Sequence, residues 1–457
     1  MSDVAEALQQ ILPAEHVLAG DDITEDYTRD ETLSYEAGTP AVVVRPGTAE
    51  DVAAICRLAS ERGTPIVARG SGTGLSGAAI PPPDAILISF ERMNAIVEID
   101  TENHVAVVQP GVTLAQLDEA LAPLGLVYPV HPGETSGSLG GNAATNAGGM
   151  RAVKYGVTRN QIIGLQCVLA DGRIIRTGGK LAKSSTGYDL TQLIIGSEGT
   201  LALVTEAILK LHPRLPHRAT VLAPFRTLEE ITRAVPRIVA SGVGPMILEY
   251  IDAFTMAAIT AHVGLDLGIP DAIKETATAY LVVVMESARP ERLDEDVTAV
   301  GELVTGLDAM DVYILPPQAG QQLIEAREKA FWTAKAANAA DLVDIVVPRA
   351  AIAEFFTHVV AIAAEHETFL AGCGHAGDGN VHLSVFQPDP DKRYRVMRAL
   401  FEAGMSVGGA ISGEHGIGRS KKKYFLELED PTKIELMRGI KKVFDPRGIL
   451  NPGTLFD

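Results

Sequence analysis

Cysteine is scarce in this 457-residue chain, which contains only Cys56, Cys167 and Cys373. Cysteines so few and so far apart can build neither a disulfide framework nor a zinc knuckle, and they fit a reducing compartment. Long apolar runs are also missing, since stretches such as Leu281 to Met285 end far short of the ~18 residues that a membrane-spanning helix needs. The N-terminus has early acidic residues and no signal-peptide pattern. We therefore expect a soluble, cytoplasmic protein without a transmembrane segment, and docking on the inner membrane or on another subunit stays open.

Positive charge is in short supply as well. The chain has 39 Lys and Arg against 58 Asp and Glu, a formal net charge of −19. Such a surface repels phosphate backbones, so nucleic acid is not expected as a partner. The 46% of hydrophobic residues, with 44 Gly and 26 Pro, are typical of a globular protein with many tight turns. The length allows roughly two to four domains.

Two strand–helix–strand patterns, at 41–69 and 105–130, open the chain and favour two β-α-β units in one α/β domain. In each pattern a threonine precedes the helix as its N-cap, and a glycine ends the helix. The segment HPRLPHR, with Pro213 and Pro216, is the best candidate for a domain boundary. Between 220 and 315 the predicted order is strand, helix, strand, strand, helix, strand, which is typical of a ferredoxin-like split β-α-β fold.

Three glycine-rich segments, 72–77, 133–149 and 196–200, stand out from this background. The first reads GTGLSG and matches the Gly-x-Gly-x-x-Gly string of dinucleotide-binding loops. A Rossmann loop opens a helix, however, and the Pro81-Pro82-Pro83 run that follows leaves no helix to open. Small residues that expose their backbone, with short Ser, Thr and Asn side chains among them, suit a large cofactor with polar edges. The alternative is a series of tight turns without a ligand.

The segments ARGSGTGLSG, GSLGGNAATNAGG, STGYDLTQLIIGSEGTLALVTEAILKL and FDPRGILNPG resemble the FAD-binding domain of the vanillyl-alcohol oxidase superfamily. Over nearly its whole length the chain is similar to the FAD-linked D-2-hydroxy acid dehydrogenases, which include D-lactate dehydrogenase, the glycolate oxidase flavin subunit and D-2-hydroxyglutarate dehydrogenase. This resemblance implies an α+β fold with a two-part FAD-binding domain, 1–213, and a ferredoxin-like cap or substrate domain, 218–430, that carries a metal site. A small helical C-terminal segment, 431–457, would return to the FAD-binding domain.

The resemblance also implies which residues hold FAD. Non-covalent binding is expected, because the loop that would hold the pyrophosphate contains neither His nor Cys. The residues expected at the pyrophosphate are Arg69, Gly70, Ser71, Gly72, Thr73, Gly74, Leu75 and Gly77. Those expected along the flavin and ribityl chain, or reaching the same pocket from the tail, are Pro132, Ser136, Gly140, Asn142, Thr145, Gly148, Glu198, Gly199, Val204 and Asn451.

A histidine cluster provides the second set of candidates. The stretch 369–383 reads as two strands joined by an Asp-Gly turn, which can bring His375 and His382 to the same end of a sheet. With Glu414 they form a divalent-metal set that suits Zn, Mn or Fe, whereas the alternative is a group of structural histidines. HAGDGNVH and GEHG match the metal motif of the family, which implies His375, His382 and Glu414 as ligands and His415 beside the substrate.

In the chemistry that the resemblance implies, His415 accepts the hydroxyl proton of a 2-hydroxy acid and Arg327 binds its carboxylate. Cys373 is interpreted as a small buried residue rather than a metal ligand. Phe331 and Trp332 follow Arg327 where relatives acting on D-2-hydroxyglutarate add cationic groups. This difference favours a small monocarboxylic substrate such as D-lactate.

Several alternatives stay open at this point. The chain could be a D-2-hydroxyglutarate dehydrogenase, a glycolate oxidase flavin subunit, a non-catalytic FAD-binding subunit or a metallohydrolase. The sequence has no nicotinamide fingerprint and no Fe–S cysteine set. The electron acceptor could therefore be a quinone, an electron-transfer flavoprotein, a cytochrome or a partner subunit, and a homodimer is compatible with the sequence.

Overall fold

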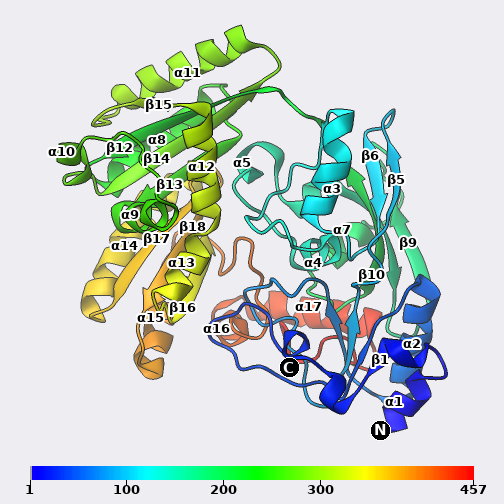
Figure 1. Ribbon diagram of the computed structural model, residues 1–457. Helices are drawn as coiled ribbons and strands as arrows, with labels where there is room; N and C mark the ends of the chain where they lie inside the picture. The colour runs from blue at the N-terminus through cyan, green and yellow to red at the C-terminus, as the bar shows by residue number, and fades with distance from the viewer. Residues whose placement is uncertain (1–2, 457) are drawn as a thin grey trace.

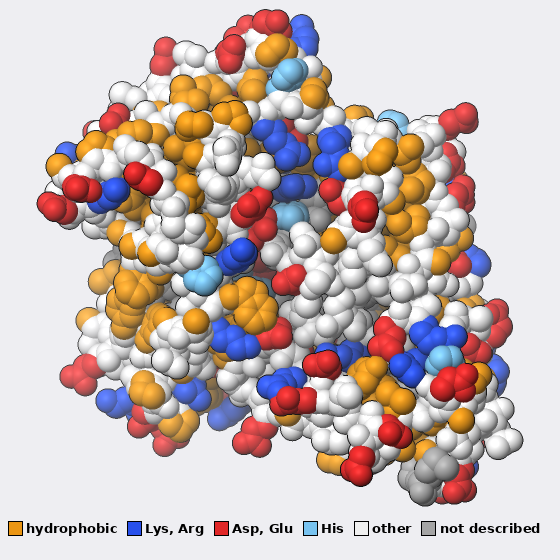
Figure 2. All heavy atoms as spheres, viewed as in Figure 1, with side chains coloured by type: hydrophobic (Ala, Val, Ile, Leu, Met, Phe, Trp, Pro, Cys, Tyr) orange, Lys and Arg blue, Asp and Glu red, His pale blue; other side chains and the backbone are white. Residues whose placement is uncertain are grey.

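Two lobes make up the part of the chain that the computed structural model describes, residues 3–456, and the surface is hollowed between them (Figures 1 and 2). One lobe contains the N-terminal sheets together with the last two helices. The other lobe is built on a seven-stranded sheet. This mixture of sheets and helices confirms the predicted α+β class.

The first sheet follows the predicted pattern at 41–69. Its strand order is β1 (Val17–Leu18), β2 (Val42–Val44), β4 (Ile86–Ser89), β3 (Ile66–Arg69). Helix α2 (Ala49–Arg62) begins with a capping box between Thr48 and Asp51 and ends at Gly63, whose φ is 68°. Both β2 and β3 pair in parallel with β4, so α2 is a crossover helix that packs on the sheet.

The second sheet departs from the prediction for 105–130. Its order is β5 (Ile96–Asp100), β6 (Val105–Val108), β10 (Leu203–Lys210), β8 (Ile162–Val168), β9 (Ile174–Gly178), with antiparallel pairing throughout. Helix α3 (Leu114–Leu121) begins at Thr113 as expected. The strand after it, β7 (Leu126–Val127), pairs with β11 (His212–Pro213) and does not return to β6. Both edges of β6 are already occupied, by β5 and by β10. The prediction of a second β-α-β unit is therefore wrong.

The cap sheet contains the predicted ferredoxin-like order within a larger sheet. Its strands are β15 (Tyr313–Leu315), β12 (His217–Phe225), β14 (Ala279–Ser287), β13 (Ile247–Asp252), β17 (Phe369–His375), β18 (Asn380–Phe386) and β16 (Asp341–Val346), in that order. The first four strands, with α8 (Leu228–Ala240) and α11 (Pro290–Thr305), form the split β-α-β unit. The predicted histidine hairpin, β17 and β18, continues the same sheet beside β13.

Alternate residues of the cap strands are buried on opposite faces of the sheet, as the pleat requires. In β14, Leu281 and Val283 belong to one apolar core, while Val282 and Val284 belong to another. The remaining helices of this lobe are α9 (Ala253–Val263), α10 (Asp271–Lys274), α12 (Pro317–Glu328), α13 (Ala330–Ala336), α14 (Ile352–Glu365) and α15 (Pro390–Ser406).

The other helices of the chain are α1 (Asp3–Leu8), α4 (Leu139–Thr145), α5 (Ala152–Tyr155), α6 (Thr158–Gln161), α7 (Leu190–Ile194), α16 (Lys422–Leu428) and α17 (Pro431–Phe444). Across residues 3–456, no helix combines the length and apolar character needed to cross a membrane.

The C-terminal segment returns to the first lobe, where α17 lies near the N-terminal part of the chain (Figure 1). The Lys441 ammonium group donates to Asp445 Oδ2 at 2.6 Å and to the carbonyl oxygens of Thr200 at 2.8 Å and Leu450 at 2.7 Å. Asp445, which is buried, in turn accepts from the backbone N–H groups of Ile449 and Leu450. This network fixes the tail against β3, where Leu450 bridges to Ile66.

We expect Lys441→Met to loosen this tail, because Asp445 would lose its cation and two carbonyl oxygens would lose a charged donor. The loss should be about 1 to 3 kcal/mol of local stability, seen as faster hydrogen exchange in 445–456. Lys442→Met, at the exposed neighbouring position, is the matched control. Equal exchange rates in the two variants would show that the network does not hold the tail.

Candidate active site

A cleft runs along the predicted glycine-rich loops of the first lobe and is bordered by cap-lobe residues that include Phe331 and Glu414. Glycine and small polar residues dominate its walls, so backbone is exposed to whatever lies in it. The predicted cofactor residues that line the cleft are Gly70, Ser71, Gly72, Thr73, Gly74, Leu75, Pro132, Asn142, Thr145, Gly148, Glu198, Gly199 and Asn451. Loops far apart in the sequence therefore meet around one space, as a single large ligand requires.

The other predicted cofactor residues lie beside the cleft. Gly140 and Val204 line a smaller cavity, which shares Gly70 and Gly199 with the cleft. The remaining three predicted residues, Arg69, Gly77 and Ser136, shape the glycine-rich loops. Arg69 donates from Nη1 to the carbonyl oxygen of Arg29 at 2.6 Å, Gly77 turns the chain with a φ of 75°, and the Ser136 carbonyl oxygen accepts from Ser71 at 2.6 Å.

The polar atoms in the cleft fit FAD. Asn142 Nδ2 and Asn451 Oδ1 are buried without a hydrogen-bond partner among the described residues, and both side chains line the cleft. Buried polar groups of this kind need partners, which the ring edges and hydroxyls of a flavin cofactor would supply. Glu198 also lines the cleft, and burial raises its pKa to about 7. Its carboxylate accepts from the backbone N–H groups of Ile417 and Gly418, at 2.8 Å and 2.7 Å.

The predicted metal ligands come together in the cap lobe. The antiparallel register of β17 and β18 sets His375 diagonal to His382, with 5.0 Å between their ring centroids. Glu414 Oε1 lies 3.0 Å from His375 Nε2 and 3.2 Å from His382 Nε2. All three side chains are buried, and Glu414 Oε2 has no hydrogen-bond partner in the described part of the chain. Two imidazoles and an unsatisfied carboxylate at this spacing fit a divalent metal ion.

Glu249 is part of the site, although no motif marks it in the sequence. It lies on β13 with 0% exposure, and its Oε1 is 2.6 Å from His375 Nδ1. Its Oε2 is 2.8 Å from Arg327 Nη2. Burial alone would lower the pKa of His375, but the negative charges of Glu249 and Glu414 raise that pKa well above its usual value. Glu249 thus orients the imidazole and balances the guanidinium at once.

Arg327 is buried in the last turn of α12. The contact of Nη2 with Glu249 lacks hydrogen-bond alignment, so both Nη2 and Nε are without an acceptor among the described residues. Two unsatisfied donors on one planar group suit bidentate binding of a carboxylate.

Asp344 holds the loop that carries Glu414 and His415. Its Oδ2 accepts from the Ser412 hydroxyl at 2.6 Å and from the backbone N–H groups of Glu414 and His415, at 3.2 Å and 2.9 Å. Burial opposes its ionisation, but His415, Lys421 and His382 lower the pKa of Asp344 well below its usual value. Asp344, His382 and His415 also lie within metal-ligating distance of one another. Asp344 does not line the chamber described next, whereas all of His375, His382 and Glu414 do.

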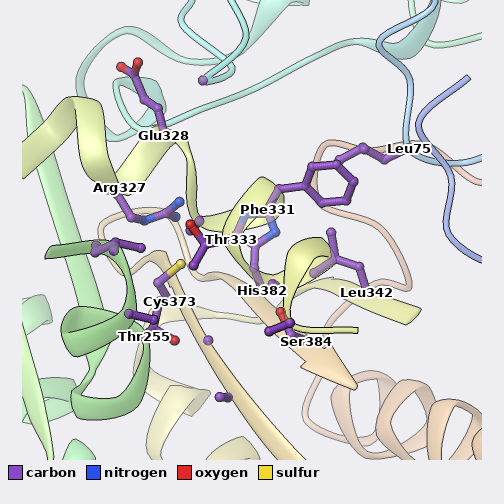
Figure 3. A pocket seen from close by; sticks show the side chains of 18 of the residues that line it. Leu75, Thr255, Arg327, Glu328, Phe331, Thr333, Leu342, Cys373, His382 and Ser384 are labelled. Carbon is purple, nitrogen blue, oxygen red and sulfur yellow. The ribbon is translucent and has the colours of Figure 1, made fainter. Parts of the chain in front are cut away.

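A chamber joins this cluster to the cleft. The lining residues that the two spaces share are Leu75, Pro132, Gly133, Glu328, Phe331, Glu414 and His415. In Figure 3, Arg327, Thr333, Cys373 and Thr255 lie on one side of the chamber, opposite His382, Leu342 and Ser384.

His415 and Cys373 both line the chamber, and they differ in whether the side chain carries a proton. His415 stacks on His382 with 5.0 Å between ring centroids, and burial lowers the pKa of His415 to about 4. Its ring is therefore neutral and can accept a proton. Cys373 is buried opposite His382 in the strand register, and burial raises its thiol pKa to about 11. The thiol stays protonated and belongs to neither candidate metal group.

Comparison with known proteins shows the family of this chain. The family model "FAD binding domain" matches residues 40–178, and "FAD linked oxidases, C-terminal domain" matches 214–455. An uncharacterised FAD-linked oxidoreductase of Mycobacterium tuberculosis is 56% identical over 456 residues, covering 100% of this chain and 99% of that protein. D-lactate dehydrogenase of Anaerostipes hadrus is 36% identical over 462 residues, covering 99% and 97%.

A likeness in structure extends to more distant proteins. The 4-ethylphenol oxidase of Gulosibacter chungangensis superposes with a TM-score of 0.79 at 18% identity, covering 99% of this chain and 96% of that one. Such a likeness concerns the fold alone. The chain therefore belongs to the FAD-linked oxidases, with the two-part FAD-binding fold of the vanillyl-alcohol oxidase type.

Proposed function

We propose that this FAD-linked oxidoreductase oxidises a D-2-hydroxy acid with a single carboxylate, of which D-lactate is the simplest, to the 2-oxo acid. One observation carries the proposal. A buried arginine with two unsatisfied donors faces the same chamber as the His375, His382 and Glu414 cluster, and this chamber opens into the FAD cleft at His415. FAD would be bound non-covalently, since the loops 70–79 and 133–148 contain neither His nor Cys.

The residues take distinct parts in this reaction. FAD, when bound, supplies a two-electron acceptor, and a divalent ion such as Zn, Mn or Fe, when bound by His375, His382 and Glu414, lowers the pKa of a substrate hydroxyl. Arg327 holds the carboxylate through Nε and Nη2 and so fixes the orientation of the carbon that is oxidised. His415, at the junction of chamber and cleft, accepts the hydroxyl proton.

The chamber supports a monocarboxylic substrate. Arg327 is the one Lys or Arg among the described residues that line it. Lys335 pairs with Glu31 at 2.7 Å, and the buried Lys421 lies 3.5 Å from Asp344, so both are engaged elsewhere. Of the aromatic pair after Arg327, Phe331 lines the chamber, while Trp332 is 42% exposed and lines only the cleft.

We expect Gly74→Asp to reduce bound FAD at least ~10-fold, because the new carboxylate would face the cofactor phosphates and lie beside a buried acid. A Cβ at Gly74 would lie 3.5 Å from Asp30 Oδ2, which leaves room for a side chain. Gly74→Asn is the matched control of equal size without charge. The flavin content of both purified variants is read from visible absorbance. A full complement of flavin in the Asp variant would remove this loop from the phosphate site.

His382→Ala and Glu414→Ala should each lose the metal ion and at least ~100-fold in turnover while keeping most of their flavin, because His382 does not line the cleft and Glu414 is one of its many lining residues. Metal content by elemental analysis and flavin absorbance separate the two effects. His262→Ala, at an exposed position, serves as the control. Undiminished activity of the wild-type protein after exhaustive chelation would exclude the metal from the reaction.

D-lactate should exceed D-2-hydroxyglutarate in kcat/KM by at least ~100-fold, equivalent to ~2.7 kcal/mol, because a second carboxylate would be desolvated without a cationic partner. Dye-reduction rates of the holoenzyme with D and L forms of both acids measure the ratio. A preference for D-2-hydroxyglutarate would mean that Lys335 or one of the lysines 421–423 reaches the substrate.

A further inference from the structure

We propose that the chamber beyond Arg327 is a subsite for an apolar side chain of about four or more carbon atoms. The best substrates would then be medium-chain aliphatic D-2-hydroxy acids, with D-lactate a poor one. This inference rests on the proposed function and specifies its substrate class.

The chamber extends past the groups that would bind a three-carbon acid. Beyond Arg327 and the histidine cluster, its walls continue along α9, α13 and the strands β16, β17 and β18. Lactate extends only one methyl group past the carbon that is oxidised. A substrate of that size would leave these walls in contact with water, which is unfavourable where they are apolar.

Besides Arg327 and the metal-ligand cluster with His415, the charged or polar side chains in the chamber wall are Thr255, Glu328, Thr333 and Ser384. Arg327 and the histidine cluster supply the groups that bind the acid and its hydroxyl. Apolar or small side chains form most of the other walls: Phe254, Ala258 and Ile259 of α9, Ala330, Ala334 and Ala337 near α13, and Leu342, Ala371 and Phe386 of the sheet strands. The Thr333 hydroxyl donates to the Lys329 carbonyl oxygen at 3.1 Å, so it does not need a ligand.

Helix α13 creates the space by its sequence. Ala330, Thr333, Ala334 and Ala337 follow the spacing of one helical face, and all line the chamber. Larger residues at these positions would fill the gap between α13 and the sheet. The small side chains therefore leave a volume that the fold itself does not occupy.

An aromatic cluster extends the apolar path to the surface. Phe254 and Phe386 line the chamber, and Phe369 packs edge-on against Phe254, with 5.0 Å between ring centroids. Phe254 is 52% exposed and Phe369 is 50% exposed. An alkyl chain that outgrows the chamber would thus meet aromatic rings rather than open water.

The length of the substrate's alkyl chain should therefore determine kcat/KM. Each buried methylene contributes ~0.8 kcal/mol, or roughly fourfold in binding. D-2-hydroxyhexanoate has three methylenes more than D-lactate, so we expect its kcat/KM to be at least ~20-fold higher. The gain per carbon should diminish once the chain reaches the aromatic cluster.

The test uses the holoenzyme and a series from D-lactate to D-2-hydroxyoctanoate, with dye reduction as the assay. Ala334→Leu, which narrows the chamber, should lower the ratio of kcat/KM for D-2-hydroxyhexanoate over D-lactate at least ~10-fold. Ala336→Leu, on the exposed side of the same helix, should leave this ratio unchanged.

A second measurement does not depend on turnover or on the variants. Hexanoate, which lacks the hydroxyl, should inhibit the wild-type enzyme at least ~20-fold more strongly than propanoate. Equal kcat/KM values along the series, or equal inhibition by the two alkanoates, would overturn the subsite and leave the proposed function intact. Failure of every D-2-hydroxy acid to reduce the enzyme would overturn the proposed function and the subsite together.

Discussion

The candidate site depends on one buried carboxylate, that of Glu249, which pairs with the imidazole of His375 and the guanidinium of Arg327 in a largely apolar sheet. A charge with 0% exposure is costly unless it is paired, and Glu249 meets this need through His375 at 2.6 Å and Arg327 at 2.8 Å. Strand β13 is held on both sides, by β14 and by β17, so the carboxylate has little freedom. The imidazole and the guanidinium are therefore positioned before any substrate enters.

The loop 412–418 joins the two lobes around this site. From the cap lobe, Asp344 accepts from the backbone N–H groups of Glu414 and His415. From the first lobe, Glu198 accepts from two further N–H groups of the loop, and the Ser76 hydroxyl donates to the His415 carbonyl oxygen at 2.7 Å. The residues proposed to bind metal and accept a proton are thus fixed by the same contacts that shape the FAD cleft. Displacement of either lobe would alter both parts of the site.

Sequence patterns predicted the elements whose signals are local. The cap at Thr48 and the glycine at Gly63 gave the bounds of α2, and the Asp-Gly turn predicted the hairpin of β17 and β18. The predicted pairing of the strand after α3 was wrong, because this pairing depends on whether an edge of β6 is free. The extension of the ferredoxin-like sheet by β17, β18 and β16 also went unpredicted, since strand pairing across such distances leaves no local trace.

The sequence by itself determined the glycine-rich loops, the family to which they belong and the residue types that can bind a metal ion, because these are set by short motifs. Only the tertiary structure decided the partners of those residues. Glu249 and His375 are 126 positions apart, and no pattern links them until β13 and β17 pair. The chamber likewise exists only where the small face of α13 lies opposite α9 and the sheet. Burial and pairing of distant segments create both features, and neither is encoded in a contiguous stretch of the chain.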